Sequence, residues 1–191
     1  MRRGVSVGLC VAAMAAMCVW LTGCRSPRVP ATVAHLLLSD AGLAALPEAA
    51  GVSVQVSLRP VELPEYLEGR RMVQVLDGDR VETVVGHGWA ESFGPAVRAA
   101  LEENLARLLG VPCLYGDGGE RLTLAFRRLS LTDRGTVGVS VLCRSSRTGR
   151  SPRLFEFEEP VAEASRPSAA YSAALSRLSR EVAVWLLATR P

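Results

Sequence analysis

The sequence predicts a single α+β domain in which an antiparallel or mixed β-sheet is covered by two amphipathic helices. Three observations support this fold class. Apolar and polar residues alternate in several short runs, as they do in half-buried strands. Two longer segments repeat apolar residues at helical spacing, and the order along the chain is strands, helix, strands, helix. Two helices with one apolar face each need a sheet face to cover, which gives this architecture.

The strand predictions rest on runs of alternating or continuous apolar residues. They are, in chain order, His35–Ser39, Val52–Leu58, Met72–Leu76, Arg80–Val85, Leu122–Phe126, Val137–Val141 and Leu154–Phe157. The first is expected to be fully buried and the second half-buried. The third and fourth flank Asp77-Gly78-Asp79, a turn-forming tripeptide that predicts a hairpin, and Gly86-His87-Gly88 is expected to end the fourth.

Two helices are predicted from their apolar stripes and end signals. In the first, Ser92 is expected to cap the start, Pro95 suits the first turn, and Gly110 follows the last residue. Its apolar stripe consists of Val97, Leu101, Leu105 and Leu108. The second helix closes the domain with Tyr171, Leu175, Leu178, Val182 and Trp185.

The N-terminus has the pattern of a secretory signal peptide over residues 1–23. Arg2 and Arg3 precede the apolar run Val5–Leu21, and small residues stand just before Cys24. Leu21-Thr22-Gly23-Cys24 resembles a bacterial lipobox, in which the Cys thiol carries a diacylglyceryl group as a thioether. Cys24 is therefore the predicted lipidation site. The alternative is an uncleaved membrane anchor, which the short apolar run disfavours.

Residues 24–34 are predicted to be a lipidated linker, and residues 35–191 the domain that it holds at a membrane. Pro27 and Pro30 favour an extended conformation in this linker. Arg25 stands where Asp would retain such a lipoprotein in the inner membrane. The expected location is therefore the outer membrane, with the domain facing the periplasm.

Composition argues against catalysis and nucleic-acid binding. The formal net charge of +3 falls to about +1 without Arg2 and Arg3, so no strong basic field is left to attract nucleic acid. The chain contains no Lys, and its two histidines, His35 and His87, have no evident carboxylate or metal-ligand partner in sequence. We therefore expect neither an enzyme nor a cofactor or metal ion, and interpret His87 as structural.

Two cysteines of the mature chain, Cys113 and Cys143, have two interpretations. They could form a disulfide, since the expected compartment permits one. They could equally be two small buried hydrophobic residues.

Three further features are candidate contact sites. Pro64, Tyr66 and Leu67 lie in a Pro-bounded segment that a central strand would not tolerate. Tyr66 and Leu67 either contact a partner protein or plug one end of the core.

A predicted hairpin tip at Thr148-Gly149 is surrounded by Arg144, Arg147, Arg150 and Arg153. We favour a solvated turn there over a contact with lipid head groups or an acidic partner. The glutamates Glu156, Glu158 and Glu159 could bind a cation, but ordinary strand alternation accounts for them.

Several segments resemble the PqiC-like family of ABC-type transport auxiliary lipoproteins (paraquat-inducible lipoprotein C). They are Leu36–Ser39, Val61–Leu67, Gly88–Glu91, Leu101–Gly110 and Tyr171–Leu178, in the order and spacing of that family. The resemblance implies an accessory subunit that works with an MCE-domain protein and, in many systems, an ABC transporter that moves lipids between the two membranes. It implies docking of the transport conduit at the outer membrane and a role in envelope integrity. The alternative is a structural lipoprotein that assists outer-membrane or lipopolysaccharide assembly, and a homo-oligomer is left open.

Overall fold

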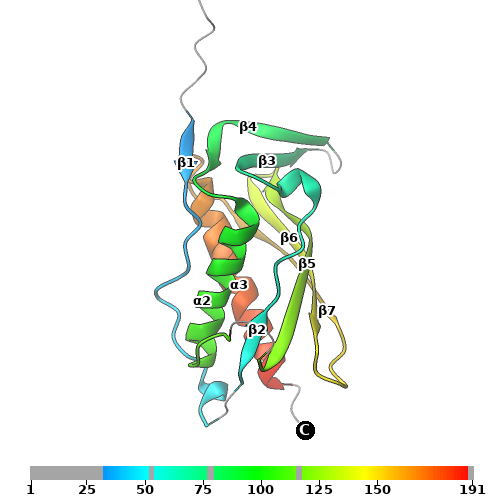
Figure 1. Cartoon of the computed structure of the whole chain (residues 1–191). Helices are drawn as coiled ribbons and strands as arrows, with labels where there is room; N and C mark the ends of the chain where they lie inside the picture. Colours follow the sequence, from blue (N-terminus) through cyan, green and yellow to red (C-terminus); the bar gives the residue numbers. More distant parts are fainter. Residues whose placement is uncertain (1–31, 52–53, 77–79, 115–117, 189–191) are drawn as a thin grey trace, which may run out of the picture. The chain divides into compact units, whose positions relative to one another are not determined.

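A mixed seven-stranded sheet and two long helices make up the described part of the computed structural model, which covers residues 32–51, 54–76, 80–114 and 118–188 (Figure 1). The strands are β1 (Val33–His35), β2 (Val56–Leu58), β3 (Arg71–Leu76), β4 (Arg80–Trp89), β5 (Glu120–Thr132), β6 (Thr136–Ser145) and β7 (Arg153–Pro160). The helices are α2 (Phe93–Leu109) and α3 (Pro167–Ala188), and short 3₁₀ turns form η1 (Pro47–Ala49) and η2 (Glu65–Leu67). The predicted α+β fold class is confirmed.

The sheet is mixed because three of its pairings are parallel. Its strand order is β1-β4-β3-β5-β6-β7, and β2 joins beside β5. The pairs β3/β4, β5/β6 and β6/β7 are antiparallel, whereas β1/β4, β3/β5 and β2/β5 are parallel. The longest strand, β5, has 13 residues and pairs with three others. The predicted hairpin of β3 and β4 is confirmed, although its turn, Asp77-Gly78-Asp79, lies outside the described residues.

The helices pack against each other, and α3 also packs against β6 and β7 on the face of the sheet that both helices cover (Figure 1). Their predicted stripes are buried, with Leu101 and Leu175 at most 1% exposed. At one end of this core, the Trp89 and Phe93 rings stack at 4.7 Å. Tyr171 meets both rings edge-on at 5.0 and 5.7 Å. The core therefore lies between the helices and this face of the sheet.

The signals at the two ends of α2 have different outcomes. Gly110 follows the helix with φ 67°, a left-handed conformation that glycine adopts without strain. Ser92 makes no side-chain capping hydrogen bond, contrary to the prediction. Instead, the Phe93 amide donates to the Gly69 carbonyl at 2.9 Å, so a neighbouring segment satisfies a free amide of the first turn.

The strand predicted for His35–Ser39 is wrong after its first residue. The strand is β1, which ends at His35, and the Leu36 and Leu38 side chains are 56% and 61% exposed. Beyond β1, the Leu38 amide donates to the Ser172 hydroxyl of α3 at 3.1 Å, so the backbone turns to the helix rather than continuing in the sheet.

The boundaries of two other strands also differ from the prediction. Gly86-His87-Gly88 does not end β4, which continues to Trp89 because β1 pairs with its last residues. The half-buried run over Val52–Leu58 is reduced to β2. All three residues of β2 are buried, and residues 52 and 53 lie outside the described residues.

We predict unequal costs for replacing two glycines that share a left-handed conformation. Gly119 has φ +69° and Gly135 has φ +70°, but a Cβ at Gly119 would strike the Gln55 carbonyl, whereas one at Gly135 would meet nothing within 4 Å. Gly135→Ala should lower the free energy of unfolding by about 1 kcal/mol through backbone strain alone. Gly119→Ala should cost at least about 1 kcal/mol more, because the clash adds to the strain.

The measurement is urea unfolding of both variants beside the wild-type protein. Gly135→Ala is the matched control, since it carries the strain without the clash. Equal midpoints for the two variants would contradict the close approach of Gly119 to Gln55.

Candidate functional site: an apolar groove and a histidine pair

The Pro-bounded segment over residues 59–69 runs beside β5 after β2 ends. The Arg59 amide donates to the Leu122 carbonyl at 2.9 Å, and the Glu62 amide donates to the Leu124 carbonyl at 3.0 Å. The Phe126 amide returns a bond of 2.8 Å to the Glu62 carbonyl. Pro60 and Pro64, which lack an amide hydrogen, therefore fall outside these bonding positions. The chain then turns through η2.

The three residues singled out in this segment have different surroundings. Leu67 is 2% exposed and belongs to the core, so it plugs the core and is covered in this structure. Pro64 and Tyr66 are partly buried. Burial raises the pKa of the Tyr66 phenol, while Ser130 and the nearby Arg128 guanidinium act in the opposite direction. Only Pro64 and Tyr66 thus keep exposed surface for a partner.

An apolar groove lies between this segment and the start of α2, with a volume of about 400 Å³. Pro60, Val61 and Leu63 line one side, and Gly94 and Pro95 line the other. A Cβ on Gly94 would come within 3.4 Å of Leu63, so glycine permits this close approach. The groove is therefore built largely from apolar and proline side chains.

One cation and one anion reach this groove. Arg98 lines it and forms an ion pair of 2.9 Å with Glu102 on the next turn of α2, and Glu68 lines the rim. Among its lining residues there is no nucleophile–base pair. The arrangement can hold apolar groups beside one guanidinium.

The two histidines of the chain form a hydrogen-bonded pair. His35 Nε2 lies 2.8 Å from His87 Nδ1, and the two rings stack with centroids 5.0 Å apart. The Ser168 hydroxyl of α3 lies 3.2 Å from His35 Nδ1. The pair therefore joins β1, β4 and α3. His35 is 8% exposed, and burial, followed by the neighbouring His87, lowers its pKa.

The Arg-rich hairpin is neither wholly a solvated turn nor wholly a contact surface. Arg144, Arg147 and Arg153 are exposed, but the Arg150 side chain is 1% exposed and forms an ion pair of 2.8 Å with Glu120. Its guanidinium donates to the Trp185 and Leu186 carbonyls at 2.7 and 3.0 Å. Because these carbonyls lie in the last turn of α3, Arg150 fixes the end of that helix to the sheet.

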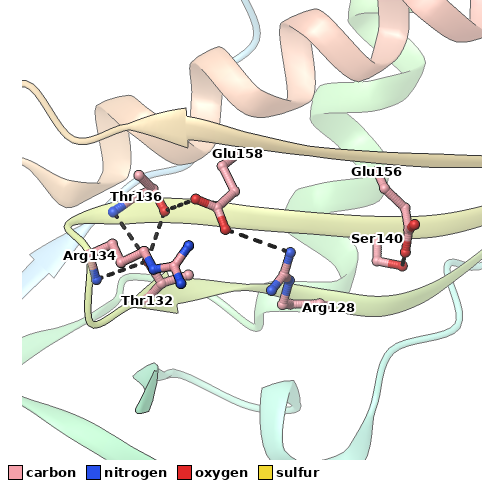
Figure 2. Close-up of polar contacts among 7 residues, drawn as sticks. All are labelled: Arg128, Thr132, Arg134, Thr136, Ser140, Glu156 and Glu158. Atoms are coloured by element: carbon pink, nitrogen blue, oxygen red, sulfur yellow. Dashed lines mark hydrogen bonds and ion pairs between the residues drawn. The ribbon is translucent and has the colours of Figure 1, made fainter. Parts of the chain in front are cut away.

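Glu156 and Glu158 of β7 are engaged in contacts along the sheet face opposite the helices (Figure 2), whereas Glu159 lies 3.9 Å from Arg177 of α3. Glu156 accepts a hydrogen bond of 2.8 Å from Ser140, and Glu158 accepts one of 3.0 Å from Thr136. Arg128 lies 4.0 Å from Glu158. Within the described ranges, no group of three or more His, Cys, Asp or Glu side chains could hold a metal ion.

The two cysteines are not brought together: both are free thiols. The Cys113 thiol donates to the Glu102 carbonyl at 3.3 Å, and burial raises its pKa to about 11. Cys143 is fully buried in β6, and burial raises its pKa to about 12. In this structure Cys143 is a small buried residue of the core, and Cys113 packs against the core while partly buried.

A family model described as "ABC-type transport auxiliary lipoprotein component" matches residues 36–183. The chain belongs to this family. The match covers most of the chain and confirms the resemblance seen in the sequence. The auxiliary lipoproteins of ABC-type transport are not a known enzyme family.

Two solved structures share the fold of this auxiliary lipoprotein. One is described as an uncharacterized protein, with 16% identity and a TM-score of 0.65, over 80% of this chain and 97% of the other. The second is protein XCC0632 from Xanthomonas campestris, of family DUF330. It has 14% identity and a TM-score of 0.61, over 83% of this chain and 94% of the other. No curated protein matches the chain.

The family match begins at residue 36, so Cys24 precedes it, and Cys24 also lies outside the described residues. Neither α2 nor α3, the long helices of the described part, is apolar enough over a sufficient length to cross a membrane.

Sequence reasoning missed the histidine pair and the buried arginine. His35 and His87 are 52 residues apart and meet through a parallel pairing of β1 with β4. A parallel pairing leaves no local signal in a sequence, unlike a hairpin. That the chain has two histidines in all was a usable hint. Arg150 was grouped with its exposed neighbours by spacing alone.

The histidine pair predicts a loss of stability in mild acid. The folded state favours neutral His35 because its pKa is lowered from the ordinary 6.5. The associated stability is therefore present above about pH 6.5. It is lost progressively as the pH falls through that value toward the lower folded pKa. The thermal midpoint should therefore decrease as the pH is lowered from about 7.5 to about 5.

His35→Gln combined with His87→Asn should flatten this dependence, because amide side chains can hydrogen-bond without titrating. Since the chain has two histidines, this variant contains none, and the comparison isolates the pair from other histidine effects. An unchanged slope of midpoint against pH in the double variant would refute the assignment.

Proposed function

We propose that this protein is a lipid-anchored accessory subunit of an MCE/ABC-type intermembrane lipid transport system. Its acylated Cys24 would hold the domain at the outer membrane, facing the periplasm, where it would dock the transport conduit and support envelope integrity. The observation that carries this proposal is the family match over residues 36–183, joined to a lipobox-like sequence just upstream.

The groove gives this docking role a physical basis. Its apolar walls and Arg98, the one cation among its lining residues, suit the side chains of another protein. Tyr66 lies on η2, the 3₁₀ turn between the groove residues Leu63 and Glu68, and is partly exposed. A rigid aromatic side chain is a common anchor of a binding interface. We therefore infer that the periplasmic part of an MCE-domain protein contacts Pro64, Tyr66 and the groove.

A structural role in outer-membrane or lipopolysaccharide assembly is the second candidate. It would use the same anchor and would also require no catalysis. The two candidates differ in the partner that the domain binds, and a binding experiment separates them.

Cys24→Ala should abolish acylation and leave the precursor with its signal peptide, because the thioether needs the thiol. The measurement is metabolic labelling with palmitate, followed by mass determination of the protein. Cys18→Ala is the matched control, since it removes a nearby thiol of the signal peptide and should leave labelling intact. Equal label in Cys24→Ala and wild type would contradict the lipoprotein assignment.

Tyr66→Ala and Arg98→Glu should each weaken binding of the mature protein to the periplasmic part of the MCE protein by roughly tenfold or more, the usual cost of losing an interface anchor. The measurement is a titration with purified components, after circular dichroism has verified that each variant is folded. Leu154→Ala is the control, because Leu154 is a similarly exposed side chain on β7, away from the groove.

Two outcomes of this titration have different meanings. Failure of the wild-type protein to bind would contradict the transport-accessory role and favour the assembly role. Binding that both groove variants leave unchanged would contradict only the assignment of the contact to this groove.

A further inference from the structure

Exposed aliphatic side chains gather around the strand at which the chain enters the domain. Among the described residues, seven large hydrophobic side chains are exposed. Four of them lie on β1, just after it, or next to the residues of β4 that pair with β1. These four are Val33, Leu36, Leu38 and Val85, exposed by 55%, 56%, 61% and 77%. Single exposed aliphatic residues are ordinary, but a concentration of them at one part of a fold indicates an interaction surface.

The local structure makes Leu36 and Leu38 protrude. They line a groove of about 460 Å³ whose other wall is the start of α3, where Ala169, Ser172 and Ala173 have short side chains. The Leu38 amide is fixed to the Ser172 hydroxyl at 3.1 Å, and the His35 carbonyl accepts from the Ala90 amide at 2.8 Å. The backbone is thus held on both sides, while the two leucine side chains have no cover of their own.

The length of chain before the domain limits where this surface can be. Residues 24–31 number eight, and a fully extended chain spans at most about 3.6 Å per residue. An anchor at Cys24 would therefore keep β1 within about 30 Å of the bilayer. Such a short tether also raises the effective concentration of the membrane around nearby side chains, so that a few weak contacts suffice for binding.

We propose that Val33, Leu36, Leu38 and Val85, here called the β1 surface, rest in the interfacial region of the phospholipid bilayer that holds the anchor. This inference rests on the lipidation of Cys24 in the proposed function and adds an orientation to it. Aliphatic side chains that enter the head-group region gain part of their transfer free energy. Because the tether already holds the domain nearby, the β1 surface needs only to orient it.

The experiment uses the full mature lipoprotein in vesicles of phosphatidylethanolamine with a minority of phosphatidylglycerol. An environment-sensitive fluorophore is attached to Leu36→Cys or, in a second variant, to Leu38→Cys. Phospholipids with a nitroxide on the acyl chain near the head group act as quenchers. We expect a loss of fluorescence and a blue shift at both positions when the quencher lipid is present.

Val184→Cys provides the matched control. Val184 is 47% exposed on α3, and it lies 16 residues beyond Ser168, about 24 Å along the helix axis. Its fluorophore should keep its intensity in the same vesicles. Unmodified protein gives the labelling background, which should be low because burial raises the pKa values of Cys113 and Cys143 to about 11 and 12.

The outcomes separate this inference from the proposed function. Protein that does not float with the vesicles lacks the anchor, which would overturn both. Protein that floats but is quenched equally at positions 36 and 184, or at neither, would overturn the orientation while leaving the lipoprotein intact. A blue shift at position 36 without quenching would mean that a protein, for instance a second copy, covers the β1 surface, and would also overturn the inference.

Discussion

The need to hydrogen-bond both edges of β5 determines much of this fold. A strand of 13 residues presents amides and carbonyls on two sides, and those that are buried must be paired. On one side, β6 pairs with it almost throughout. On its other side, three short segments supply the partners: β2 pairs with the start of β5, the chain at Glu62 with its middle, and β3 with its end. The groove lies where the segment that follows Glu62 turns away from β5.

A second constraint is visible at the far end of β5. Beyond the irregularity between Phe126 and Arg128, the Leu131 amide donates to the Tyr171 hydroxyl at 3.0 Å rather than to the backbone of a neighbouring strand. The ring of Tyr171 packs against Trp89 and Phe93, so one side chain satisfies a buried donor and fills the core. Burial raises the pKa of the Tyr171 phenol well above its usual range, so it remains a neutral partner.

The sequence contains the local elements of this fold because their signals are local. The stripe of Leu101, Leu105 and Leu108 needs one helix to be recognised, and the β3/β4 hairpin needs one turn. The pairings of β1 with β4 and of β2 with β5 join segments more than 50 residues apart and are parallel, so no turn announces them. The continuous apolar run also gave a wrong prediction for Leu36 and Leu38, since apolar side chains that stay exposed look like a buried strand in sequence.

The same difference between local and distant signals decides which residues of the candidate sites could be predicted. Pro64 and Tyr66 could be assigned to an irregular, partly exposed segment because proline restricts its neighbours in any context. Arg150 could not be separated from Arg147, because its burial depends on Glu120 and on the last turn of α3, neither of which is near it in sequence. Burial of a charge is a property of distant partners, and spacing does not encode it.

The groove lies close in the chain to the residues that pair with β1, the strand with which the described domain begins. Trp89 pairs with His35 of β1, and three residues later Ser92 lines the groove. The Arg70 carbonyl accepts from the Trp89 amide at 2.7 Å, and its neighbour Gly69 lines the groove as well. A partner in the groove would therefore sit close to the strand that continues the tether. The backbone pairing of β1 with β4 and the His35–His87 hydrogen bond hold β1 in place. The length of the linker would therefore limit the height of the bound partner above the membrane.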